Sequence, residues 1–211
     1  MDGATLQKRV YTGYAKAAAR IGLPYTLCRP YSALAPLEQQ VTTLQAAFSQ
    51  NEKFSKPSEY GDPTYLALFD GNQAKPGDYL VGTEDTFFIA GMQHINPILC
   101  VSCNRVLNVL RPTQPTGVGA VGYGGDIAAT EVPLLQGWPA SILQGTKGEK
   151  NPAGIPSDER LPWWQILFPS FSGVVLLTSD VITDDIGHRY TISSAELSDL
   201  GWRITAAMQG A

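Results

Sequence analysis

Two stretches of the sequence, PSEYGDPTYLALF (57–69) and PSDERLPWWQILF (156–168), share the pattern P-S-acid-x3-P-x-aromatic-x2-L-F. They lie 99 residues apart, and further matching residues follow both of them in the same order. The matching pairs are Gly71 with Gly173, Asp78 with Asp180, Phe87 with Tyr190, Ile89 with Ile192, Leu99 with Trp202, and Val101 with Ile204. Weaker matches upstream pair Pro36-Leu37-x-Gln39 with Pro133-Leu134-x-Gln136, and Leu44-Gln45 with Leu143-Gln144. This order predicts a tandem duplication of one structural unit.

The repeated part has the composition of β-strands. Val, Ile, Leu and Phe are frequent, between turn residues, in the ranges 79–90, 98–110, 174–182, 188–194 and 200–207. The run DDIG (184–187) predicts a hairpin turn, because glycine readily adopts the positive φ that such turns require. Each half is therefore expected to form a small antiparallel sheet or barrel.

The first residues follow a helical pattern instead. Apolar side chains from Leu6 to Ile21 recur at three- and four-residue spacing, between Asp2 as a possible N-cap and Gly22 as a helix end. Leu37, Val41, Leu44 and Phe48 have similar spacing, which predicts a second helix with Pro36 in its first turn. The corresponding segment of the other half carries Gly137 and Pro139, which disfavour a helix there.

Together these patterns predict an α+β fold, mostly β, with an N-terminal amphipathic helix and two similar small antiparallel β units. The expected division is a helix over residues 1–22, a first β-rich repeat over 23–111, a Gly/Pro-rich linker over 112–132 and a second β-rich repeat over 133–211.

The composition limits the classes of partner. Charged residues make up only 16% of the 211 residues, which favours a surface partly covered by other subunits over a loop-rich monomer. The net charge of −4 argues against binding to a phosphate backbone, although DNA could pass such a surface unbound. No run of 18 apolar residues or apolar signal core is present, so neither a membrane span nor secretion is expected. Three cysteines fit a reducing compartment.

A flexible apolar stretch is the strongest candidate for contacts with other subunits. Between Pro112 and Thr146 the only charged residues are Asp126 and Glu131, and the centre reads GVGAVGYGG (117–125). Ordering so many glycines costs backbone entropy, which packing against another surface would offset. The segment lies either over a neighbouring subunit or over its own chain. The residues predicted to line an interface are Val118, Val121, Tyr123, Trp138 and Trp163.

No motif in the sequence predicts a cofactor, a metal ion or a catalytic residue. Gly117-x-Gly119-x-x-Gly122 has the letters of a dinucleotide fingerprint, but prolines precede it and further glycines follow it where a strand and a helix are needed. Cys100 and Cys103 form a CxxC within a strand-like run, where residues three apart point to opposite faces. Both are therefore expected to be structural cysteines.

Asp180, Asp184 and Asp185 form the one acidic group that resembles a site for Ca²⁺ or for acid–base chemistry. The group lacks EF-hand spacing, and His188 and Arg189 lie close enough in sequence to neutralise it. We therefore interpret it as a solvated turn, with a hydrolase that uses Asp180, Asp184 and His188 as the alternative from another class. An oligonucleotide-binding barrel is a further alternative, but no basic track accompanies the aromatic residues.

Several motifs resemble virion proteins encoded in the structural-gene clusters of tailed phages. They are MDGATLQKRVYTGYAKAAARIGLPYTLCRP (1–30), PGDYLVG (76–82), VGAVGYGG (118–125), GWPASILQGTKGEK (137–150) and DDIGHRYTISSAELSDLGWR (184–203). The resemblance implies a non-enzymatic particle protein in the virion tail or neck, present in the host cytoplasm during assembly. It brings no catalytic residues.

The resemblance and the duplication together favour a head-to-tail connector or tail adaptor subunit. A tail hub, baseplate or fibre-anchoring protein is the alternative. The expected partners are copies of the chain itself, in a ring of six or twelve, and portal, tail tube or tail fibre proteins. Six copies of a two-repeat chain would present twelve similar surfaces, a way to join a twelvefold to a sixfold structure.

Overall fold

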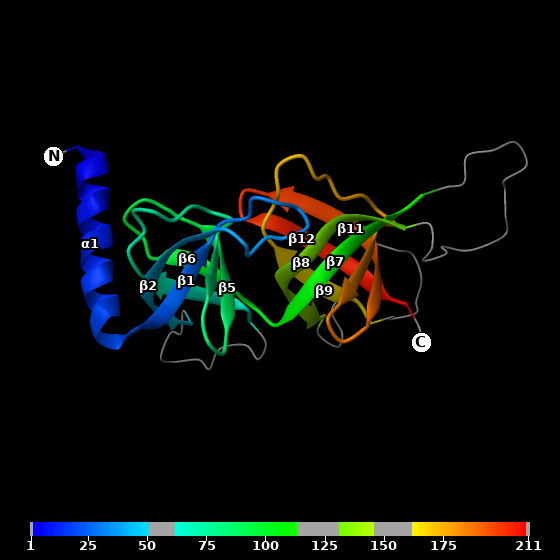
Figure 1. The fold of residues 1–211 in the computed structure, drawn as a ribbon, viewed down its shortest axis with the longest axis horizontal. Helices are drawn as coiled ribbons and strands as arrows, with labels where there is room; N and C mark the ends of the chain where they lie inside the picture. Colours follow the sequence, from blue (N-terminus) through cyan, green and yellow to red (C-terminus); the bar gives the residue numbers. More distant parts are fainter. Residues whose placement is uncertain (1, 51–61, 114–130, 146–161, 210–211) are drawn as a thin grey trace, which may run out of the picture.

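The computed structural model describes residues 2–50, 62–113, 131–145 and 162–209. Within these ranges one helix, α1 (Gly3–Ile21), precedes twelve strands. The first six are β1 (Leu23–Cys28), β2 (Gln40–Ser49), β3 (Thr64–Leu68), β4 (Tyr79–Val81), β5 (Thr86–Gly91) and β6 (Ile98–Cys103). The others are β7 (Arg105–Pro112), β8 (Glu131–Gln144), β9 (Trp164–Phe168), β10 (Val181–Asp184), β11 (Arg189–Ser198) and β12 (Gly201–Met208). Helix α1 lies at one end of the elongated molecule (Figure 1).

The strands form two closed antiparallel barrels with the same topology. Barrel 1 has the order β1-β2-β3-β6-β5-β4, and barrel 2 has the corresponding order β7-β8-β9-β12-β11-β10. A β-bulge follows Ile89 in barrel 1 and the matching Ile192 in barrel 2. The predicted fold class, one helix and two similar β units, is thus confirmed.

Strand register shows which residues of the two barrels are equivalent. Tyr65 pairs with Cys100 and Trp164 pairs with Ala206, so the central match of Tyr65 with Trp164 is confirmed. Some outer matches are shifted. Leu44, opposite Tyr25, corresponds to Trp138 rather than to Leu143. On β6 the equivalent of Ile204 is Ile98 rather than Val101. Ile204 pairs with Ile166 of β9, and Ile98 pairs with the equivalent residue of β3, Ala67. The match of Pro36 with Pro133 is also wrong, since Gln40 occupies the place of Pro133.

The boundary between the repeats differs from the predicted one. Strand β7, which had been assigned to the first repeat ending at 111, is the first strand of barrel 2, and only Asn104 separates it from β6. The segment 112–132 therefore connects β7 to β8 within barrel 2 and does not link the two repeats. The strand composition of residues 98–110 agrees with β6 and β7, but no turn signal in the sequence marks the boundary between these strands at Asn104.

The N-terminal helix is confirmed, whereas the second predicted helix is wrong. Residues 40–49 form β2, in which Leu44, Ala46 and Phe48 alternate toward the core of barrel 1. This two-residue period coexists in the sequence with the helical spacing, and closure of the barrel selects it. Of the predicted strand 174–182, only residues 181 and 182 belong to a strand, because residues 174–180 are irregular and include a turn at 178–179.

The two barrels share a continuous apolar core at their junction. Tyr79 and Phe88 of barrel 1 belong to the same buried cluster as Trp138 and Ile142 of barrel 2. The Tyr79 hydroxyl donates a hydrogen bond to the carbonyl oxygen of Pro139 at 2.9 Å, and the Trp138 indole donates one to the carbonyl oxygen of Ala33 at 2.7 Å. The tyrosine and indole rings meet edge to face, with centroids 6.2 Å apart. These contacts join the barrels through buried groups.

Each barrel also contains the same ion pair, between a half-buried arginine and a buried aspartate. In barrel 1, Arg29 follows β1 and donates two hydrogen bonds to Asp78, from Nε at 2.8 Å and from Nη2 at 2.6 Å. In barrel 2, Arg111 donates to Asp180 in the same way, at 2.8 Å for both bonds. Each aspartate also accepts a backbone N–H three residues before it, from Lys75 or from Leu177. The pair therefore fixes the turn that leads into β4 or β10.

We expect Asp78→Ala and Asp180→Ala each to lower the free energy of unfolding by about 2–4 kcal/mol, because each leaves a guanidinium and a backbone N–H without their partner. Urea denaturation measures the change. The matched control is Glu196→Ala, which breaks the exposed pair with Arg203 and is expected to cost less than about 1 kcal/mol. Equal losses in the three variants would contradict the role given to these two pairs.

Candidate functional site

The acidic turn between β10 and β11 gathers several polar groups around one carboxylate. The Asp184 side chain is buried, and its Oδ1 accepts the backbone N–H groups of Ile186 and His188 at 3.2 and 2.7 Å. Its Oδ2 accepts the Tyr190 hydroxyl at 3.1 Å and lies 3.2 Å from Nδ1 of the half-exposed His188. Gly187 has a φ of 88°, so the predicted hairpin turn is confirmed.

The three acidic residues of the sequence analysis have separate surroundings. Asp180 is buried and paired with Arg111, and Asp184 is buried in its own turn, so neither is part of a solvated turn. Asp185 is exposed and lies 4.0 Å from Arg105. Arg189 pairs with Glu131 rather than with this group. The carboxylates of Asp180 and Asp184 are therefore occupied by structural hydrogen bonds, whereas Asp185 and His188 remain accessible.

Cys100 and Cys103 lie in different apolar clusters. Cys100 is part of the core of barrel 1, whereas Cys103 packs against the apolar cluster at the junction. Burial raises the pKa of both thiols above its usual value, and neither they nor Cys28 form a disulfide. This placement on different sides of β6 agrees with the interpretation of structural cysteines.

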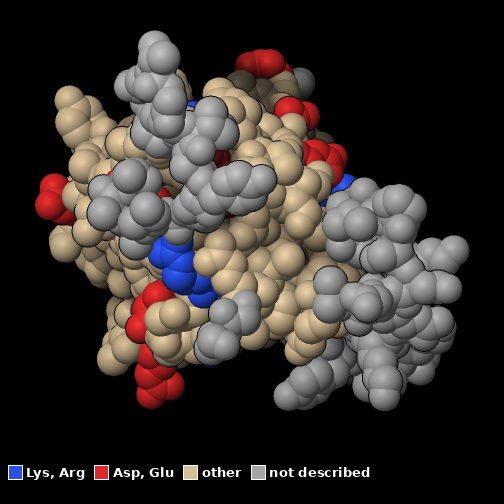
Figure 2. Space-filling model, turned by 90° about the vertical axis from the view of Figure 1, so that its right-hand side faces the viewer, with Lys and Arg blue, Asp and Glu red and all other residues tan. Residues whose placement is uncertain are grey.

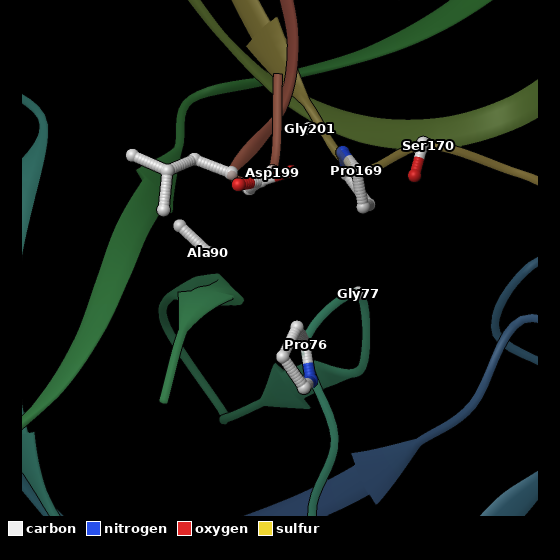
Figure 3. Close-up of a pocket in the computed structure, with 8 residues that line it drawn as sticks. Pro76, Gly77, Ala90, Pro169, Ser170, Asp199 and Gly201 are labelled. Atoms are coloured by element: carbon white, nitrogen blue, oxygen red, sulfur yellow. The ribbon is translucent and has the colours of Figure 1, made fainter. Parts of the chain in front are cut away.

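A small cavity lies where the two barrels meet. Pro76, Gly77 and Ala90 of barrel 1 face Pro169 and Asp199 of barrel 2 across it (Figure 3). Its volume is about 50 Å³, whereas pockets for small organic ligands span roughly 300–1,000 Å³. The cavity has room for water molecules only.

The described residues hold neither a metal cluster nor a membrane-spanning helix. Within the described ranges, no three His, Cys, Asp or Glu side chains gather as metal ligands would, and no helix has the length and apolarity to cross a membrane. On the face seen from the barrel 2 end, the visible basic side chains lie beside acidic ones and form no continuous track (Figure 2).

Two of the five predicted interface residues can be placed. Trp138 is fully buried and contacts Tyr79 and Phe171, so its interface is the one between the two barrels of its own chain. The prediction that Trp138 contacts another subunit is thereby corrected. Trp163 is half-buried and lies against Gly145, where a Cβ atom would come within 2.2 Å of the indole. Val118, Val121 and Tyr123 lie outside the described residues.

Helix α1 exposes more of its surface than the sequence pattern predicts. Ala18 is its only fully buried residue, and Tyr11 and Tyr14 on the inner side are half-buried. Tyr11 lies against Gly71, and the Tyr14 hydroxyl donates a hydrogen bond to the carbonyl oxygen of Ile95 at 3.1 Å. The apolar Ile21 was expected on the buried face, but it is 71% exposed. The helix is thus attached along a narrow stripe.

Comparisons of the chain with protein-family models, with curated proteins and with solved structures found no match.

Replacing Gly145 with alanine is expected to displace the Trp163 indole, because the new Cβ would overlap it. Tryptophan emission should shift to the red and acrylamide quenching should increase. The same substitution in a Trp163→Phe background should leave both signals unchanged. Gly13→Ala is the matched control, since a Cβ at Gly13 meets no atom within 4 Å. Unchanged emission in Gly145→Ala would show that Trp163 is not held there.

The turn predicts a loss of stability at alkaline pH. Burial, followed by the hydrogen bond to Asp184 and its charge, raises the pKa of Tyr190 from 10.0 to about 12. Between these values the folded chain keeps a proton that the unfolded chain releases, so the free energy of unfolding falls as pH rises. Urea denaturation from about pH 9 to about pH 11 should show a shallower fall in Tyr190→Phe than in the wild type. The exposed Tyr31→Phe is the control and should keep the wild-type slope.

Proposed function

We propose that this protein is a structural subunit of a tailed-phage particle, namely a head-to-tail connector or tail adaptor that forms a ring. The observation that carries the proposal is the duplicated barrel, fused with a single residue between β6 and β7. Such a chain presents the same barrel topology twice. A ring of six copies would therefore offer twelve related barrels to a twelvefold portal and six whole subunits to a sixfold tail.

The junction between the barrels supports a role in which the subunit keeps a fixed shape. Tyr79 and Trp138 are fully buried there and hydrogen-bonded to backbone carbonyls of the opposite barrel. The Asn104 side chain, between the barrels, donates to the carbonyl oxygen of Ile142 and accepts its backbone N–H. These interactions hold the two barrels in a fixed relation, which suits a subunit that transmits geometry from one ring to the next.

The proposed partners are copies of the chain, portal proteins, and tail tube or tail fibre proteins, in the neck or tail of the virion. DNA would pass the ring without specific binding, in keeping with the net charge of −4. A tail hub, baseplate or fibre-anchoring role places the same subunit elsewhere in the particle and differs in the partner that it contacts.

A hydrolase is the rival proposal, because His188 lies 3.2 Å from the carboxylate of Asp184, as in an acid–base pair. Against it, the same carboxylate is held by two backbone N–H groups and by Tyr190, which fits a structural turn.

Mass photometry of the purified protein, alone and with portal protein, tests the proposal. The expected species is a closed ring of six copies that joins a portal ring. Cell-wall digestion by the wild type and by His188→Ala is measured in parallel, with Asp185→Ala as the control. Digestion by the wild type that is lost in His188→Ala would favour the hydrolase, and a protein that stays monomeric with portal present would overturn the ring.

A further inference from the structure

The junction between the barrels shows which face of this barrel unit another domain covers. Pro139 and Ser141 of β8 alternate with the inward residues Trp138, Ala140 and Ile142, and therefore lie on the outer side of the strand. Both are buried, because β5 and β6 of barrel 1 pack against β8. The β11–β12 turn of barrel 2 also reaches barrel 1, where Leu200 lies beside Gly91.

In barrel 1, helix α1 covers the equivalent face. The counterpart of β8 is β2, and α1 packs against β2 and β3. The counterpart of the β11–β12 turn is the β5–β6 loop, and it reaches α1, where the backbone N–H of Ile95 donates to Gln7 at 2.9 Å. Helix α1 therefore occupies on barrel 1 the position that barrel 1 occupies on barrel 2.

The helix covers this face incompletely. Gln45 and Ala47 of β2 are the equivalents of Pro139 and Ser141, yet Gln45 is exposed and Ala47 only half-buried. At the end of the helix Ile21 is 71% exposed, and the adjoining Leu23 is 66% exposed. A face that buries its residues against a barrel in one repeat is thus left partly open in the other.

The charge of the helix favours an acidic partner. Residues 3–21 contain Lys8, Arg9, Lys16 and Arg20 and no acidic residue, a charge of +4. Because the whole chain has a net charge of −4, its other residues carry −8. Lys8, Thr12, Lys16 and Arg20 follow one another at four-residue spacing along one stripe, and Lys8, Lys16 and Arg20 form no ion pair with any described residue. Like charges at this spacing repel one another until an anionic surface approaches.

We propose that α1 and the adjoining outer edge of β2 form the docking surface for a second copy of this chain, in a head-to-tail contact. We call this surface the α1 face and define it by Lys8, Lys16, Arg20, Ile21, Leu23 and Gln45. The proposal rests on the proposed function, which requires contacts between copies. A head-to-tail contact joins two different surfaces, so its repetition closes into a ring when the rotation allows it.

The β11–β12 turn of the neighbouring copy has the matching chemistry. Leu197 and Leu200 are 54% and 50% exposed, and each directly follows an acidic residue, Glu196 or Asp199. Glu196 is partly neutralised by Arg203, whereas Asp199 forms no ion pair with any residue that the structure describes. An acidic and apolar turn thus meets a basic and apolar helix. The attraction between opposite charges and the burial of apolar side chains therefore favour the same orientation.

The test compares Lys16→Glu/Arg20→Glu with Lys75→Glu, which changes the charge of an exposed lysine of barrel 1 outside the α1 face. Mass photometry and sedimentation over a dilution series give the protein concentration at half-assembly. We expect this concentration to rise at least about tenfold in the α1 variant and to stay unchanged in Lys75→Glu. Circular dichroism must show that the α1 variant keeps its helix and its melting temperature.

A charge exchange keeps the test decisive if the α1 variant loses stability. The variant Glu196→Lys/Asp199→Lys should also fail to assemble alone. Because the two reversed surfaces are complementary, mixing it with the α1 variant should restore assembly, and no restoration would overturn the proposal.

The other outcomes separate this inference from the proposed function. A wild type that remains monomeric at all concentrations would overturn both. A wild type that assembles equally well with the α1 substitutions would overturn the docking surface and leave the ring intact. Salt-sensitive binding of wild-type protein to double-stranded DNA that the α1 substitutions abolish, with assembly unchanged, would assign the basic stripe to nucleic acid and overturn the inference.

Discussion

The structure depends on the short connection at Asn104. A single residue between β6 and β7 leaves no slack, so barrel 2 must begin against the wall of barrel 1. The outer residues of that wall, including Tyr79 and Phe88, then form one core with Trp138 of barrel 2. Burial of this surface is favourable in proportion to its apolar area, and the hydrogen bonds to Ala33 and Pro139 satisfy the polar atoms that it takes from water. The junction is therefore a buried apolar contact that holds the two barrels together.

The two repeats have kept their internal ion pairs and diverged on their outer faces. The pairs Arg29–Asp78 and Arg111–Asp180 have the same geometry and the same backbone partners, which indicates that the turn they hold is essential to the unit. On the outer face of barrel 2, Val181 and Thr191 occupy the positions that Tyr79 and Phe88 have on the outer face of barrel 1. Only barrel 1 thus presents the large aromatic residues with which one barrel packs onto another.

The sequence was informative where a pattern is local. The N-terminal helix and the turn at 184–187 depend on residues close together in the chain, and the duplication around Tyr65 and Trp164 on two short runs with the same pattern. The structure contains all three. The strand at 40–49 was missed because helical and two-residue periods overlap there, and barrel closure decides between them. The burial of Trp138 and the exposure of Ile21 were missed for a different reason. Both depend on which domain covers the residue, and that information is spread over both repeats.

The shared core has a consequence for the order of synthesis. A ribosome completes barrel 1 before it makes β8, so Tyr79 and Phe88 face water during that interval, on a surface that is later entirely covered. Nascent chains with such exposed aromatic groups are prone to stick to one another. The tight connection at Asn104 brings only β7 to this surface at once, since β8, the strand that packs against β5 and β6, follows later in the chain.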